Sequence, residues 1–188
     1  MTIPTQLIHI EWDGPFSLTE VSRFTSEKDY GIYQIYGGHV TYGSEVLLYI
    51  GKAGAQHFGV RIPQEKWWPD NHDAARLRVY VGRLAGEITP RDKVWGKQID
   101  LAERLLIYAC VPAYNAQKNL GKLDADLQNV HVLNWGKFCD LLPEVSGLRW
   151  TSKLDQMKNY HVFDTHDRRG FASLATPGSD GEYPEPNE

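Results

Sequence analysis

Alternating apolar and polar residues predict strands, and apolar residues spaced three and four apart predict helices. A short strand is expected at QLIHIEW, residues 6–12, and Ser17-Leu18-Thr19-Glu20 fits a capping box that begins a helix ending near Phe24. Gly37-Gly38 and Gly43-Ser44 lie between two apolar stretches, which favours an antiparallel hairpin. Strands are expected over residues 30–36, 45–51, 75–86 and 129–136, with a short helix over residues 59–66.

The helical pattern is clearest between Asp92 and Cys110. Its apolar stripe consists of Trp95, Ile99, Ala102, Leu106 and Cys110. Glu103 lies within this stripe, three residues before Leu106. A carboxylate buried without a partner is costly, so Glu103 is expected to meet a cation. Two alternatives stay open: an ion pair with Arg61 or Arg78, or a hard metal ion such as Mg²⁺, which often uses only one or two carboxylates.

The composition is that of a globular protein, because 41% of the 188 residues are hydrophobic, enough for one domain with a core. No apolar run reaches the roughly 18 residues that span a bilayer. We therefore expect no membrane partner and a cytoplasmic location. Cys110 and Cys139 form no CxxC pair, which favours free thiols over a zinc site or a disulfide.

The formal net charge of -4 argues against a nucleic-acid partner until its distribution is considered. Residues 174–188 hold four acidic side chains and no Lys or Arg. The rest of the chain has equal numbers of acidic and basic side chains, so it can still carry a basic patch. The acidic tail, rich in Pro and Gly, is predicted to be disordered.

Five short motifs occur in order: GIY at 31–33, YIG at 49–51, Arg61 in FGVRI, Glu103 in AERLLIY and Asn115 in VPAYN. Together they resemble the GIY-YIG nuclease family over residues 29–116. The resemblance implies an α/β (α+β) fold with a small, mainly antiparallel three-stranded central sheet flanked by helices. Residues 1–28 would then form an N-terminal extension with a strand and a helix. Residues 117–173 would form a C-terminal extension packed on the domain, before the tail at 174–188.

The resemblance also implies a role for the matched residues. Tyr33 would act as general base or orient the attacking water, although a phenol with a pKa of about 10 needs a nearby cation or metal to do so. Tyr49 would hydrogen-bond to the scissile phosphate or to the water. Arg61 would neutralise charge on the phosphoryl oxygens, and Glu103 would hold one Mg²⁺ (or Mn²⁺) that stabilises the leaving oxygen.

The chain departs from the family after the arginine. Many relatives carry a His or another Tyr a few residues later, whereas Ile62-Pro63-Gln64-Glu65-Lys66 follows Arg61 here. His57 and His72 flank this segment, and either could supply the imidazole. Tyr33 is the preferred base.

The implied function is a metal-dependent endonuclease that hydrolyses phosphodiester bonds in DNA. Asn115 would help to arrange the site, and Lys52, directly after YIG, is a further candidate for phosphate contact. The glycine beside each motif tyrosine is expected to leave open space where a phosphate could lie. Two alternatives remain: an RNA-cleaving enzyme, because RNA presents the same phosphate, and a catalytically inactive nucleic-acid-binding or interaction module on the same fold.

Overall fold

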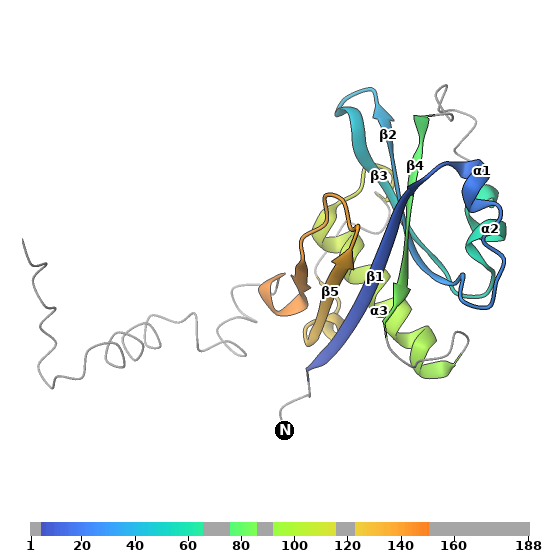
Figure 1. The fold of residues 1–188 in the computed structure, drawn as a ribbon. Helices are drawn as coiled ribbons and strands as arrows, with labels where there is room; N and C mark the ends of the chain where they lie inside the picture. Colours follow the sequence, from blue (N-terminus) through green and yellow to red (C-terminus); the bar gives the residue numbers. More distant parts are fainter. Residues whose placement is uncertain (1–4, 66–75, 86–91, 116–122, 151–188) are drawn as a thin grey trace, which may run out of the picture. The chain divides into compact units, whose positions relative to one another are not determined.

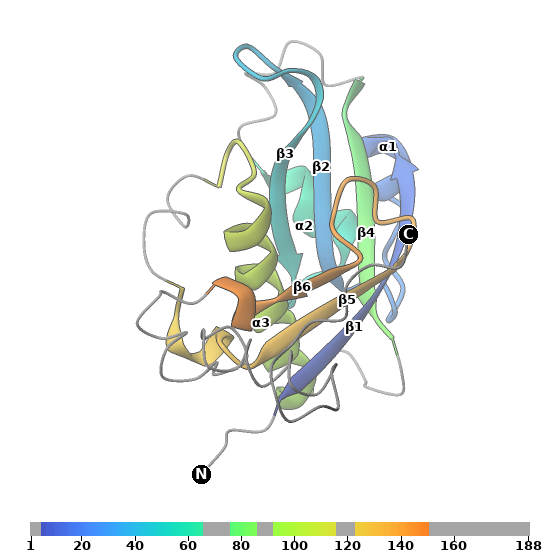
Figure 2. The same ribbon diagram turned by 90° about the vertical axis from the view of Figure 1, so that its left-hand side faces the viewer.

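A mixed β-sheet organises the computed structural model, which describes residues 5–65, 76–85, 92–115 and 123–150. The strands follow the order β3-β2-β4-β1-β5-β6, and neighbouring strands are antiparallel except for β1 and β5, which are parallel. The sheet is strongly curled, like half of a barrel (Figures 1 and 2). Its strands are β1 (Gln6–Phe16), β2 (Gly31–His39), β3 (Gly43–Ala53), β4 (Arg78–Leu84), β5 (Val130–Gly136) and β6 (Glu144–Ser146).

The α+β class is confirmed, but the expectation of a three-stranded sheet is wrong. Strands β3, β2 and β4 form a contiguous antiparallel part, and the sheet continues because β1 pairs with β4 on one side and with β5 on the other. β1 is also longer than the predicted segment 6–12 and reaches Phe16. The N-terminal strand is thus an inner strand of a six-stranded sheet. The local pattern could not reveal this, because alternation predicts a strand without identifying its neighbours.

Helices cover both faces of the sheet (Figure 1). Helix α3 (Lys93–Cys110) lies on one face, and the short helices α1 (Leu18–Val21) and α2 (Phe58–Arg61) lie on the other. The predicted helix at 59–66 is formed by α2 and the 3-10 helix that follows it, η1 (Ile62–Gln64). Two more 3-10 helices, η5 (Ala125–Leu127) and η6 (Gly147–Trp150), flank β5 and β6.

Strand β2 is buried on both faces from Gly31 to Gly37 because both helical layers cover it. Ile32 packs in the core cluster that includes the side chains of α3. Tyr33 and Ile35 pack in a second cluster that includes the side chains of α1 and α2. Alternate residues of the GIY strand therefore face different helical layers.

Two predicted helix signals are present in the structure. The capping box at α1 is formed: Ser17 Oγ accepts a hydrogen bond from the Glu20 N–H at 3.2 Å, and Glu20 Oε2 accepts one from the Ser17 N–H at 2.7 Å. Helix α3 has the predicted extent, and Glu103 is buried together with its apolar stripe. The helix ends at Cys110 because Val111 is left-handed, with φ of 47°, and a proline follows.

All described residues belong to one compact unit, Met1–Trp150. Among them, no helix is long and apolar enough to cross a bilayer. Cys110 and Cys139 are free thiols, as predicted. The tail at 174–188 and the part of the predicted extension after residue 150 lie outside the described residues.

Candidate active site

The side chains of Tyr33 and Tyr49 project from the same face of the hairpin formed by β2 and β3. Tyr33 lies opposite Gly51, and Ile35 lies opposite Tyr49. Opposed residues of an antiparallel pair share a face. The two rings have centroids 6.1 Å apart and are inclined at 36°. The prediction that both tyrosines point to one side of the sheet is confirmed.

Protein atoms fill the space beside both motif glycines. A Cβ on Gly51 would lie 2.5 Å from Oη of Tyr33, and a Cβ on Gly31 would overlap the carbonyl oxygen of Gly82 in β4. Gly31 also has φ of 146°, which L side chains rarely adopt. The expectation of open space for a phosphate at these glycines is therefore wrong. Gly51 accommodates the Tyr33 ring, and Gly31 allows β4 to approach β2.

Tyr33, Glu65 and Arg61 form a hydrogen-bonded cluster. Tyr33 Oη donates to Oε1 of Glu65 at 2.8 Å, and Nη2 of Arg61 lies 2.6 Å from the same oxygen. Arg61 ends α2, and η1 continues the helical turn, so that the side chain four residues later returns to the same side. Tyr33 is fully buried, whereas the other two side chains are partly accessible.

Glu65 was not among the predicted site residues. The available signal was its position four residues after Arg61, because side chains four apart on a helical segment meet. It also stands in the segment where the resemblance led us to expect His or Tyr. Burial raises the pKa of Tyr33 well above its ordinary value, and the negative charge of Glu65 raises it further. Tyr33 is therefore a neutral phenol whose proton is directed at a carboxylate.

Glu103 meets a lysine instead of either arginine considered from the sequence. Nζ of Lys52 lies 3.1 Å from Oε2 of Glu103. Arg61 belongs to α2, on the opposite face of the sheet from α3. Arg78 pairs with a different carboxylate, Glu45, at 2.9 Å. The side chain of Glu103 is 4% exposed, so its pairing with Lys52 is nearly shielded from water.

Tyr49 is influenced by charges on both sides of the sheet. Burial raises the pKa of Tyr49 to about 12, and the negative charges of Glu65 and Glu103 contribute to the increase. Glu65 follows α2 and η1, whereas Glu103 lies on α3. These helices cover opposite faces of the sheet. β3 is an edge strand of the sheet, and charges from both helical layers act on Tyr49 there.

Asn115 supports the same edge strand. Its Oδ1 accepts a hydrogen bond from the N–H of Ile50 at 2.9 Å, and its Nδ2 donates to the carbonyl of Ile50 at 3.0 Å. The preceding residue, Tyr114, donates its N–H to the carbonyl of Leu48 at 2.8 Å. The segment after α3 therefore satisfies backbone groups that an edge strand would otherwise leave unpaired. Asn115 holds the YIG motif in place through its central residue.

A divalent cation fits the chemistry of Glu103. Within the described residues, no group of three or more His, Cys, Asp or Glu side chains is placed to hold a metal. Mg²⁺ keeps several waters and is often bound through one or two carboxylates together with substrate phosphates, so Glu103 would supply only one of its ligands. The Lys52 ammonium beside Glu103 indicates that a positive charge is favourable at this position.

The structure brings Tyr33, Tyr49 and Arg61 together on the α2 side of the sheet and Lys52 and Glu103 together on the α3 side, and it bonds Asn115 to the backbone of β3. Comparisons with protein-family models, with curated proteins and with solved structures found no match. The function must therefore be inferred from the residues of this chain. Of the two flanking histidines, His57 precedes α2 and packs its ring 4.7 Å from that of Tyr30, whereas His72 lies outside the described residues.

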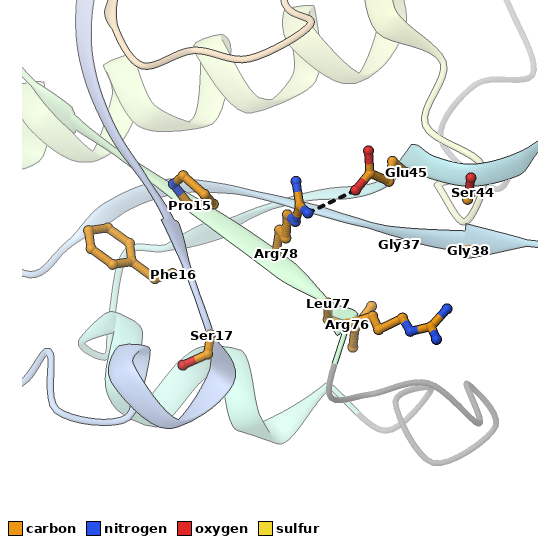
Figure 3. Close-up of a pocket in the computed structure, with 10 residues that line it drawn as sticks. All are labelled: Pro15, Phe16, Ser17, Gly37, Gly38, Ser44, Glu45, Arg76, Leu77 and Arg78. Carbon is orange, nitrogen blue, oxygen red and sulfur yellow. Dashed lines mark ion pairs between the residues drawn. The ribbon is translucent and has the colours of Figure 1, made fainter.

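A cleft of about 610 Å³ lies towards the turn of the same hairpin (Figure 3). Gly37, Gly38 and the start of β4 contribute to its walls, and Arg78 projects towards Glu45 at one side (Figure 3). None of the predicted site residues lines this cleft. It is therefore separate from the candidate site at the other end of the hairpin.

Proposed function

We propose that this chain is a metal-dependent endonuclease that hydrolyses phosphodiester bonds in DNA, with strands β3, β2 and β4 and helices α2 and α3 forming a GIY-YIG-like catalytic domain. One observation carries the proposal. Tyr33 is bonded to Glu65, which also pairs with Arg61, and Tyr49 lies beside Tyr33 on the same face of the hairpin, whereas Glu103 pairs with Lys52 on the α3 side of β3. These are the groups that phosphodiester hydrolysis requires: a proton acceptor, positive charge for the phosphate and an anchor for a cation.

The hydrogen bond from Tyr33 to Glu65 suggests how a neutral phenol can serve as a base. Tyr33 is fully buried in this structure, so an attacking water would reach Oη only after neighbouring side chains move; it would then give its proton to Oη while Tyr33 gives its own proton to Oε1 of Glu65. The hydroxide formed would then attack phosphorus. This relay avoids a free phenolate, which burial of Tyr33 disfavours.

Arg61 is suited to the phosphate because its side chain is 32% exposed while one end is fixed by Glu65. A guanidinium has five N–H donors in a planar fork, so pairing with one carboxylate oxygen leaves donors for phosphoryl oxygens. Tyr49, protonated at neutral pH, would donate a hydrogen bond to the phosphate or the water. Lys52 would add a second positive charge on the α3 side of the strand.

Glu103 would hold Mg²⁺ or Mn²⁺. When bound, the cation would supply positive charge to the scissile phosphate and to the leaving oxygen. Asn115 would act indirectly, because it hydrogen-bonds to the backbone of the YIG motif and positions that motif.

The test is a nicking assay on supercoiled plasmid with Mg²⁺, Mn²⁺ or excess chelator. We expect nicking by the wild type that chelator abolishes and that Glu103→Gln, Tyr33→Phe and Arg61→Ala each reduce by at least about a hundredfold. Arg23→Ala is the matched control, because Arg23 is an exposed arginine on the surface after α1. Its activity should equal that of the wild type.

Three results would contradict the proposal in different ways. Full activity of Glu103→Gln would remove the metal assignment. Binding of DNA without cleavage of duplex, branched or single-stranded substrates under any divalent ion would favour the inactive binding module. A parallel assay with RNA hairpins decides between the nucleic acids, since preferential RNA cleavage would overturn the DNA assignment alone.

A further inference from the structure

The ammonium of Lys52 is shared between two carboxylates of α3. Its Nζ lies 2.5 Å from Oδ1 of Asp100 and 3.1 Å from Oε2 of Glu103. The two acceptors differ in their surroundings: the side chain of Asp100 is 43% exposed and that of Glu103 is 4% exposed. One lysine therefore joins an accessible carboxylate to the buried carboxylate proposed as the metal ligand.

A divalent cation on Glu103 would face this lysine directly. The cation would bind the same carboxylate group that Lys52 contacts in this structure. The two positive charges would repel each other strongly because the buried carboxylate is poorly screened by water. Because the two positive charges would share one poorly screened carboxylate, each should weaken the binding of the other, and we expect the cation to displace Lys52 from Glu103.

Asp100 can remain paired with Lys52 after a cation displaces Lys52 from Glu103. It lies three residues before Glu103, on the same side of α3, and Nη1 of Arg104 lies 3.3 Å from its second oxygen. Nη2 of Arg104 lies 2.6 Å from Oδ2 of Asp124 and 2.6 Å from Oδ1 of Asp126, which belongs to η5. Arg104 thus fixes the second oxygen of Asp100, while Lys52 contacts the first.

We propose that Lys52 pairs with both Glu103 and Asp100 in the metal-free protein and with Asp100 alone when a divalent cation binds. Asp100 is then a positioning residue that sets the metal affinity of Glu103, and Lys52 stays close enough to contact a phosphate. The inference rests on the proposed metal role of Glu103. It goes further by naming Lys52 as the competitor for that carboxylate and Asp100 as the residue that retains Lys52.

The experiment measures Mn²⁺ binding to the full chain without nucleic acid, by electron paramagnetic resonance of free Mn²⁺. Lys52→Met removes the competitor, so we expect binding at least about tenfold tighter than in the wild type. Asp100→Asn leaves Lys52 on Glu103, so binding should weaken by at least about fivefold. In the Lys52→Met background, Asp100→Asn should change the affinity by less than about twofold.

Two controls keep these effects specific. Asp13→Asn removes the same charge from an exposed surface pair with Lys137, and it should leave Mn²⁺ affinity unchanged. Glu103→Gln should abolish the tight site. Urea unfolding of each variant checks that the proteins are folded. As an independent readout, the side-chain NMR signal of Lys52 should shift when Mg²⁺ is added to the wild type but not to Glu103→Gln.

The outcomes separate the inference from the proposed function. If Glu103→Gln loses the site but Asp100→Asn weakens binding equally with and without Lys52, Asp100 acts through its charge alone and the exchange is refuted. Unchanged affinity in Lys52→Met refutes it as well. If wild type, Lys52→Met and Glu103→Gln bind Mn²⁺ equally or fail to bind it, the metal role of Glu103 itself is wrong.

Discussion

Gly51→Ala should disrupt the packing of both motif tyrosines. An added Cβ would lie 2.5 Å from Oη and 2.6 Å from Cζ of Tyr33, and 2.7 Å from Cε1 of Tyr49. Contacts below about 3 Å are not tolerated between such atoms, so both rings must move. Tyr33 is fully buried, and moving it also disturbs the hydrogen bond to Glu65.

The expected loss of stability follows from these contacts. Overpacking a core costs about 1–3 kcal/mol, and loss of one hydrogen bond adds about 1 kcal/mol. We expect a decrease of about 3 kcal/mol in the free energy of unfolding. With a urea m-value of about 2 kcal/mol/M, the unfolding midpoint should fall by roughly 1.5 M. A domain with a stability of about 5–15 kcal/mol would remain folded without denaturant.

The assay is urea unfolding followed by tryptophan fluorescence, together with plasmid nicking at 25 °C. Gly38→Ala is the matched control, because a Cβ on Gly38 meets no atom within 4 Å. In Gly51→Ala, displacement of Tyr33 should reduce nicking by about a hundredfold even though the protein stays folded. A midpoint and nicking rate equal to those of Gly38→Ala would refute the argument that Gly51 makes room for the tyrosines.

Three further predictions concern the surroundings of the site. Glu65→Gln should reduce nicking by about a hundredfold, and adding Tyr33→Phe should cost little more because the two act as one unit; additive losses in nicking assays would contradict the relay. Burial opposes ionisation of Asp29, but hydrogen bonds to Arg83 and Ser26 hold the pKa of Asp29 below its ordinary value. Asp29 therefore contributes stability at pH values above its unfolded pKa, and this contribution is lost as the pH falls through the folded pKa. Arg83→Met should therefore cost about 2 kcal/mol at pH 7, and urea unfolding should show a weaker loss of stability below pH of about 4 than in the wild type; parallel pH curves would contradict this. Asn115→Ala leaves two backbone groups of β3 without partners and should cost about 2–3 kcal/mol in urea unfolding, whereas an unchanged midpoint would show that water replaces the amide.

Short-range features of the fold could be read from the sequence. Helix α3, its end before Val111 and the capping box at Ser17 depend on residues within a few positions of one another. The shared face of Tyr33 and Tyr49 likewise follows from alternation within a hairpin. Periodicity and local hydrogen bonding determine such features, so neighbouring residues in the sequence contain the information needed to predict them.

The partners of the site residues depend on tertiary structure. The sequence placed Glu103 in an apolar stripe, which requires a cation, but it could not identify Lys52 instead of Arg61 or Arg78. That choice depends on which helix covers which face of the sheet, as does the pairing of Tyr33 with Glu65.

The insertion of β1 between β4 and β5 was equally invisible in the pattern. Alternation tells which residues share a face, whereas strand order and helix packing arise from the total burial of apolar surface over segments far apart in the chain. The residue types of the candidate site are therefore determined by the sequence, and their partners by the way the sheet curls and the helices pack on it.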